Sequence, residues 1–117
     1  MEKEFVSYEM ALALKELGFN EPCFDNYNIY GKLWGLRLNK QVKIKGACLA
    51  PTFSQAFRFF MEKYRLEGAI YRLNFKWASQ VFNIETSTYC FKHELFETYE
   101  EAEINSLQKM IKMAKNK

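Results

Sequence analysis

Apolar residues recur at spacings of three and four in three segments of the chain, which predicts three helices. The first, about residues 7–18, is apolar on nearly all sides, so we expect it to be largely buried and to end at Gly18. The second, about 52–65, carries an aromatic stripe, and the third, about 98–115, an aliphatic one. The two stripes comprise Phe53, Ala56, Phe57, Phe60 and Tyr64, and Ile104, Leu107, Ile111 and Ala114.

A hydroxyl residue stands where each helix should begin. Ser7, Thr52 and Thr98 are candidate N-caps, and Gln55 and Glu101 follow the last two at the spacing of a capping box. The three starts lie 45 and 46 residues apart and share a hydroxyl, an aromatic residue, two variable positions and Ala. Internal duplication explains this recurrence, and so does the common opening of a helix with a cap and an aromatic residue. Both explanations stay open.

Between the helices the apolar period changes to two, which predicts strands with one buried face. In residues 71–77, "YRLNFKW", the apolar side chains should face the helices, and in residues 41–45 Val42 and Ile44 should point inward. Further strands are expected near residues 28–38, 80–85 and 87–92, with turns at 39–40 and 78–79.

The order helix, strands, helix, strands, helix predicts an α+β fold. An antiparallel sheet with three helices packed on it would bury every apolar stripe. A chain of 117 residues has the usual length of one domain, and no linker rich in Pro, Gly or Ser interrupts it. We therefore expect a single domain over residues 1–117.

Composition narrows the class of protein. The chain is 49% hydrophobic and 17% aromatic, too apolar for a disordered segment, and no stretch approaches the roughly 20 apolar residues of a membrane span. We expect a cytoplasmic protein without membrane contact. Its three cysteines form no C-x-x-C pair, which favours buried reduced thiols over disulfides.

No motif for catalysis, nucleotide binding or metal binding is present. His93 is the only histidine, and a zinc site built from it and Cys23, Cys48 and Cys90 would lack the paired spacing of structural sites. The acidic residues of "FETYEEAE", 96–103, stand at a helix start, where they suit the helix dipole. The sequence therefore predicts no enzyme activity, no cofactor and no metal.

The distribution of charge is the remaining signal. Residues 26–61 contain no Asp or Glu but six Lys or Arg, and Trp34 and Tyr30 lie among them. Cations beside aromatic rings can hold phosphates and stack on bases, or dock on an acidic protein surface. Lysines on an ordinary solvated edge strand are the other explanation. The candidate binding residues are Lys32, Trp34, Arg37, Lys40, Lys43, Lys45 and Arg58.

Three segments, "ALALKELGFNEPC", "APTFSQAFRFFMEKY" and "TYEEAEINSLQKMI", resemble a family of small uncharacterised proteins that is frequent in phages and prophages of Bacteroidetes-type bacteria. The resemblance covers the three helices, roughly a third of the chain, and it implies a bacterial host cytoplasm. The lysine-rich middle, "GKLWGLRLNKQVKIKGA", departs from the family, so a specialised role is expected there.

Two functions remain open. The first is a non-catalytic inhibitor or adaptor that docks on a host protein or ribonucleoprotein, such as a CRISPR-type defence nuclease, by analogy with the anti-CRISPR inhibitors that phages carry. The second is a direct DNA- or RNA-binding protein that uses the same basic residues. The sequence does not predict the oligomeric state.

Overall fold

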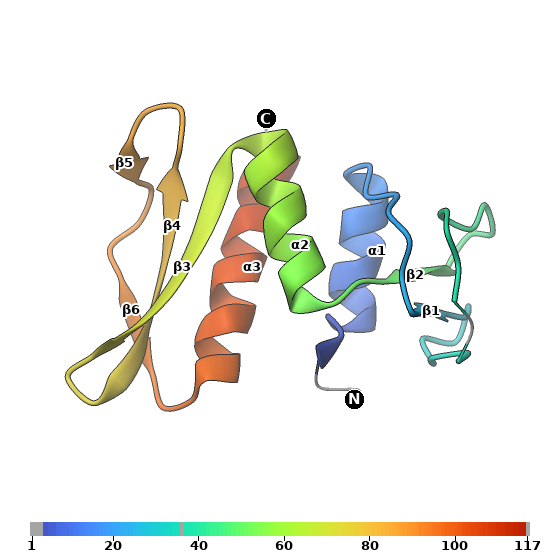
Figure 1. Cartoon of the computed structure of the whole chain (residues 1–117), viewed down its shortest axis with the longest axis horizontal. Coiled ribbons are helices and arrows are strands. Elements are labelled where there is room, and N and C mark those ends of the chain that lie inside the picture. The colour runs from blue at the N-terminus through green and yellow to red at the C-terminus, as the bar shows by residue number, and fades with distance from the viewer. Residues whose placement is uncertain (1–3, 36, 117) are drawn as a thin grey trace. The chain divides into compact units, whose positions relative to one another are not determined.

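The computed structural model has an α+β fold and describes residues 4–35 and 37–116 (Figure 1). The predicted class, element order and antiparallel pairing are confirmed, but the strands form two sheets instead of one. The elements are α1 (Tyr8–Glu16), β1 (Asp25–Tyr27), β2 (Cys48–Ala50), α2 (Phe53–Phe59), the π-helical turn η2 (Phe60–Tyr64), β3 (Leu66–Leu73), β4 (Lys76–Asn83), β5 (Thr88–Tyr89), β6 (Glu94–Phe96) and α3 (Tyr99–Lys115).

The chain divides into two compact units, residues 1–56 and 57–117, and α2 crosses the boundary between them. Each unit has its own helix and its own sheet. The expectation of one domain over residues 1–117 stays a prediction.

In the first unit, α1 packs against β2 of the β1–β2 hairpin. Ser7 caps the helix by accepting from the backbone N–H of Met10 at 3.3 Å, and Gly18 follows its last turn with a φ of 99°, which only Gly adopts without strain. The expected burial of this helix is partly confirmed, because both of its glutamates are exposed. Its buried residues are Met10, Ala11, Ala13 and Leu14.

The second helix begins with the predicted capping box. Thr52 Oγ1 accepts from the N–H of Gln55 at 3.2 Å, and Gln55 Oε1 accepts from the N–H of Thr52 at 3.0 Å. After Phe59 the helix widens into η2, which ends at Arg65 in the left-handed conformation. Phe59 and Phe60 are buried while Phe57 is half-buried, so the buried part of this helix differs from the predicted aromatic stripe.

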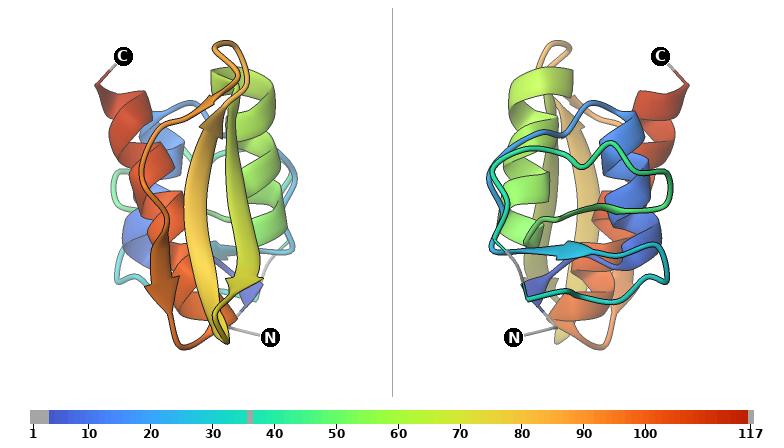
Figure 2. Two further views of the ribbon diagram at one scale, coloured as in Figure 1. Left: turned by 90° about the vertical axis from the view of Figure 1, so that its left-hand side faces the viewer. Right: turned by 90° about the vertical axis from the view of Figure 1, so that its right-hand side faces the viewer.

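The second unit is a four-stranded antiparallel sheet with α3 across one face (Figure 2). β4 is central, with β3 on one side and β5 and β6 on the other. Thr98 and Glu101 form the predicted capping box of α3. The helix meets the sheet through a buried stripe, from which Ile104 is displaced to an exposed position. The buried residues are Ala102, Ser106, Leu107, Met110, Ile111 and Ala114.

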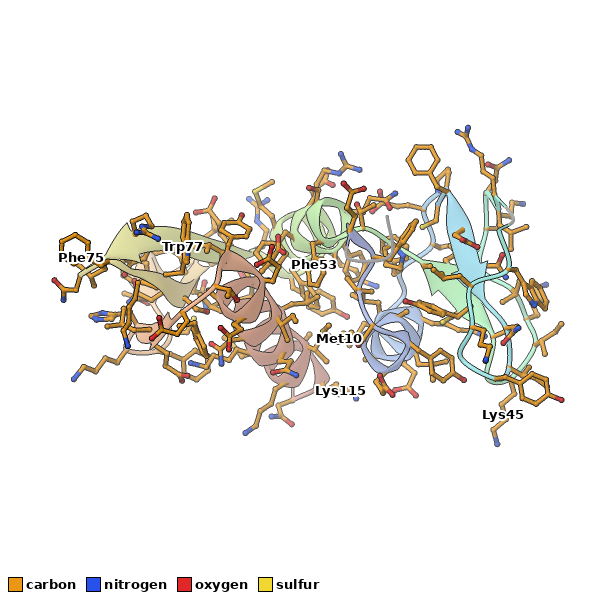
Figure 3. The ribbon with its side chains drawn as sticks, turned by 90° about the horizontal axis from the view of Figure 1, so that it is seen from below. Met10, Lys45, Phe53, Phe75, Trp77 and Lys115 are labelled. Carbon is orange, nitrogen blue, oxygen red and sulfur yellow. The ribbon has the colours of Figure 1, made fainter. Side chains whose placement is uncertain are left out.

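Residues 71–77 form a hairpin and not the predicted single strand. β3 ends at Leu73, and Asn74 and Phe75 make a two-residue turn with φ values of 52° and 65°. Such turns require positive φ at both positions and reverse the direction of the chain within two residues. The apolar and polar residues of 71–77 therefore alternate along two strands and not along one. Phe75 projects at the hairpin tip, 95% exposed (Figure 3).

The hairpin also corrects which side chains face the helix. The rings of Trp77 and of Tyr99 in α3 meet edge to face, with 5.0 Å between their centres. Arg72, the cross-strand partner of Trp77, stacks over the Trp77 ring. Because side chains alternate along a strand, Tyr71 and Leu73 lie on the opposite face of the sheet. The predicted inward set was therefore right only for Trp77.

The other strand predictions were partly wrong. Residues 41–45 are irregular and Ile44 is exposed, while the described residues of 28–38 contribute isolated bridges at Leu33 and Leu38 and no strand. The predicted turn at 78–79 is the buried middle of β4. The expected strand at 80–85 is the end of β4, and that at 87–92 shortens to β5. The turn at 39–40 is observed as a bend.

Candidate partner-binding surface

The predicted cations of the first unit lie on one long connection, which we call the basic loop: residues 28–46, between β1 and β2. Residue 36 lies outside the described residues. Connections of this length without regular structure are uncommon in compact proteins and are usually either disordered or functional. The basic loop is ordered by a series of hydrogen bonds to its own side chains and to neighbouring elements.

The start of the basic loop is a tight turn organised by Asn28. Its Oδ1 accepts from the N–H groups of Tyr30 at 2.9 Å and of Lys32 at 3.1 Å. Gly31 closes the turn with a φ of 76°, and a side chain there would meet the Tyr8 ring at 2.8 Å. Further along, Asp25 Oδ1 accepts from the N–H of Gly35 at 2.6 Å. These bonds fix the backbone on both sides of Lys32.

The end of the basic loop is tied to α1 and the segment after it. Tyr8 donates its hydroxyl to the carbonyl of Gly46 at 2.7 Å, and Lys15 Nζ donates to the carbonyls of Ile44 at 3.0 Å and Ala47 at 2.7 Å. The N–H of Gln41 donates to Asn20 Oδ1 at 2.6 Å. The backbone on either side of Lys43 is therefore held in place.

Two of the predicted binding residues, Lys40 and Lys43, line one hollow of about 530 Å³. Lys15 lines the same hollow, although its ammonium is already engaged with backbone carbonyls. The other lining residues are Gly18, Phe19, Asn20, Gln41 and Val42, none of which carries a negative charge. An anionic group that entered this hollow would lie among residues that include three lysines and no Asp or Glu.

Aromatic rings are exposed in and beside the basic loop. Tyr30 is 79% exposed, Phe24 61% and Trp34 45%. The Arg37 guanidinium lies 5.4 Å from the centre of the Phe24 ring, a cation–π contact that holds both groups at the surface. The predicted interleaving of cations and aromatic rings is therefore present on this unit.

The structure separates the predicted set into two groups. Lys32, Trp34, Arg37, Lys40, Lys43 and Lys45 all belong to the basic loop and are exposed, and Lys45 extends away from it (Figure 3). Lys43 and Lys45 do not share the side of a strand as predicted, because no strand forms there. Arg58 belongs to the second unit, where it pairs with Glu62 at 3.8 Å on the same helical face.

Sequence reasoning missed Lys15, Asn20 and Phe24. Lys15 and Asn20 lie outside the acid-free run, and only the chain reversal after α1 brings them to Lys40 and Lys43. The Asn20–Gln41 bond joins residues 21 positions apart, a separation that no local pattern reveals. Phe24, two residues before Asn26, carried a usable signal, because a large apolar residue next to a basic run is a candidate stacking surface.

None of the three cysteines, all of which lie within the described residues, is in a disulfide; Cys23 and Cys48 are buried and Cys90 is half-buried, so the prediction of buried thiols is confirmed for two. Burial raises the pKa of Cys23 to about 12, helped by the nearby charge of Glu21, and burial raises the pKa of Cys48 to about 11. Both thiols are protonated at neutral pH and are poor nucleophiles. Within residues 4–35 and 37–116, no three His, Cys, Asp or Glu side chains gather as metal ligands would.

Comparisons with protein-family models, with curated proteins and with solved structures found no match to this chain. Among the helices of the described residues, none has both the length and the apolar character needed to cross a membrane.

Proposed function

We propose that the chain is a non-catalytic binding protein that docks through the basic loop on an anionic surface of a host protein or ribonucleoprotein. The observation that carries the proposal is the hollow lined by Lys15, Lys40 and Lys43, whose lining residues include no Asp or Glu. The resemblance to phage and prophage proteins favours an inhibitor or adaptor that acts in a bacterial cytoplasm, with a CRISPR-type nuclease as one class of target.

The ordering of the basic loop supports a binding role. Lysines that only keep a surface soluble need no fixed backbone, but this loop is held by Tyr8 and Asn20, which lie outside it, and by Asn28 at its own start. Fixing the backbone before binding lowers the entropy lost on association. The exposed rings of Tyr30 and Trp34 add apolar area of the kind that dominates protein interfaces.

Direct binding of DNA or RNA is the second candidate function. Exposed rings next to cations are what single-stranded nucleic acid uses, with bases on the rings and phosphates on the cations. The Arg37–Phe24 pair and the exposed Trp34 favour this candidate.

A pull-down from bacterial lysate, with and without nuclease, separates the two candidates. A host protein that stays bound after nuclease treatment supports docking on a protein. Loss of all bound material after nuclease treatment, together with binding of a purified oligonucleotide, supports direct nucleic-acid binding.

Charge reversal tests the site itself. Changing Lys40, Lys43 and Lys45 together to Glu should weaken binding strongly, because attraction is replaced by repulsion. Unfolding free energy should change by no more than about 0.5 kcal/mol for each exposed residue. The matched control reverses Lys92, Lys112 and Lys115, which are exposed in the second unit and give the same change in net charge. If both triple variants bind as the parent does, the basic loop is not the binding surface.

A further inference from the structure

β3 is an edge strand with no strand beside its outer edge among the described residues (Figure 2). It pairs with β4 over eight consecutive residues in unbroken register, without a bulge or a proline. Natural edge strands are usually shortened, bent or interrupted, because unpaired backbone groups recruit another strand. A long regular edge is therefore a feature that needs an explanation.

The register identifies the backbone groups that are free. The N–H of Ile84 donates to the carbonyl of Arg65, so Arg65 and every second residue after it bond to β4. The alternate residues Gly68, Ile70 and Arg72 point their N–H and C=O groups toward the open edge. Only an extended backbone presents acceptors and donors at the matching interval.

A hollow of about 310 Å³ lies beside this edge. It is lined by Phe57, Arg58, Met61, Glu67 and Gly68. Only Gly fits at position 68, because a Cβ there would lie 2.5 Å from the Phe57 ring and 2.8 Å from Ser106 Oγ. The edge thus offers backbone bonds and, beside Gly68, space for one apolar side chain.

We propose that the outer edge of β3 pairs antiparallel with β3 of a second copy of this chain, centred on Ala69. In that register Ile70 of each copy stands opposite Gly68 of the other, and its side chain enters the hollow beside Phe57 and Met61. Glu67 stands opposite Tyr71, so no like charges face each other. The two four-stranded sheets become one continuous sheet.

A second copy suits the edge better than an unrelated strand because β3 carries both the apolar side chain and the space that receives it. Ile70 supplies the apolar side chain, and the hollow next to Gly68, two residues away, supplies the space, so the two-fold rotation that relates the copies satisfies both ends. Ala69, which lies on the rotation axis, is small enough to meet its own copy.

Disulfide trapping tests the register. In an Ala69→Cys variant the two new thiols would face each other across the axis at the separation that a disulfide needs. Mild oxidation should then convert most of the protein into a covalent dimer. Leu73→Cys, on the same face, is the matched control, because its thiol would stand away from its copy. The parent protein reports any background from the native cysteines.

Sedimentation equilibrium and amide exchange test the pairing without added cysteine. The parent should show a concentration-dependent dimer, and the amides of Gly68, Ile70 and Arg72 should become protected as dimer forms. Ala69→Glu, which places two carboxylates on the axis, should give monomer, while Thr88→Glu on β5 should not. A parent that is monomeric at millimolar concentration, or a dimer in which these three amides stay unprotected, would overturn the proposal. Protection induced only by a different protein would overturn the choice of a second copy.

Discussion

Asn26 lies in β1 with no exposed surface, and neither polar atom of its side chain has a hydrogen-bond partner in the described part of the chain. A buried polar group without a partner has lost its bonds to water and gained nothing in return. Its cross-strand neighbour is Leu49, so the surroundings include apolar surface. The buried amide of Asn26 therefore lowers the stability of the first unit.

Replacing Asn26 by Leu, which has nearly the same shape, should raise the unfolding free energy by about 1–2 kcal/mol. Chemical denaturation of the two proteins measures the difference. Asn20→Leu is the control, because Asn20 accepts from the N–H of Gln41 and its loss should destabilise. A destabilised Asn26→Leu protein would mean that the amide is bonded to an internal water molecule.

The buried thiols give a second prediction at this scale. With pKa values of about 12 for Cys23 and about 11 for Cys48, no more than about one thiol in a thousand is ionised at pH 8. Iodoacetamide should therefore modify Cys90 well before either in the native protein, and all three after denaturation. Peptide mass spectrometry reads the sites. Rapid native labelling of Cys23 or Cys48 would show that the first unit opens easily.

The same pKa values set a limit on stability at high pH. Both folded values exceed the usual thiol value of 9.0, so between about pH 9 and 11 the native state binds more protons than the unfolded state. Stability therefore falls as pH rises through this window. Below pH 9 the two thiols have no effect on the pH dependence.

Among the elements, the β3–β4 hairpin has the most unusual turn. Turns of this type favour Gly at the second position, and here Phe75 occupies it with a φ of 65°. Because its ring is almost wholly exposed, it contributes little burial to offset the strain. The hairpin is held instead by the pairing of its strands and by the Arg72–Trp77 contact.

Phe75→Gly should raise the unfolding free energy by about 0.5–1 kcal/mol, since Gly adopts positive φ without strain. Phe75→Ala keeps a Cβ and should leave stability nearly unchanged, which makes it the control for loss of the ring. Thermal melts of the three proteins give the ranking. Equal losses in both variants would show that the ring packs against something in solution.

The helices could be predicted from the sequence, but the strands only in part. Caps act over three residues, so Thr52 and Thr98 revealed their helices locally. Strand pairing depends on distant partners and on turns. Residues 71–77 do alternate between apolar and polar, but a turn at Asn74 and Phe75 divides them between two paired strands. At the candidate site the cations were predictable, whereas the hollow was not, because Lys15 reaches it from another element.

At the scale of the whole molecule, the net charge of +3 is small, but in the first unit the positive charge is concentrated in the basic loop. Attraction to an anion should therefore depend on local geometry more than on total charge. Long-range attraction is screened beyond about 8 Å at physiological ionic strength. The partner has to approach the basic loop itself.

Salt dependence should then distinguish the kinds of partner. If Lys40, Lys43 and Lys45 displace counterions from the phosphates of a single strand, the logarithm of the binding constant should fall with the logarithm of salt concentration at a slope of about −2.1. An acidic protein surface has no condensed counterions, and the slope should be shallower. Titrations between 50 and 300 mM salt measure it. A binding constant that does not change with salt would rule out both kinds of electrostatic docking.

The basic loop connects β1 to β2, two short strands of the first unit that pair directly with each other. The three cross-strand pairs of β1 and β2 involve no loop residue, and closing a loop costs only about 0.6 kcal/mol more for each doubling of its length. Residues 29–45 are accordingly a segment that evolution can lengthen, shorten or replace while α1 and the hairpin remain. Related chains should vary most here, and a change of partner could arise by exchange of this one segment.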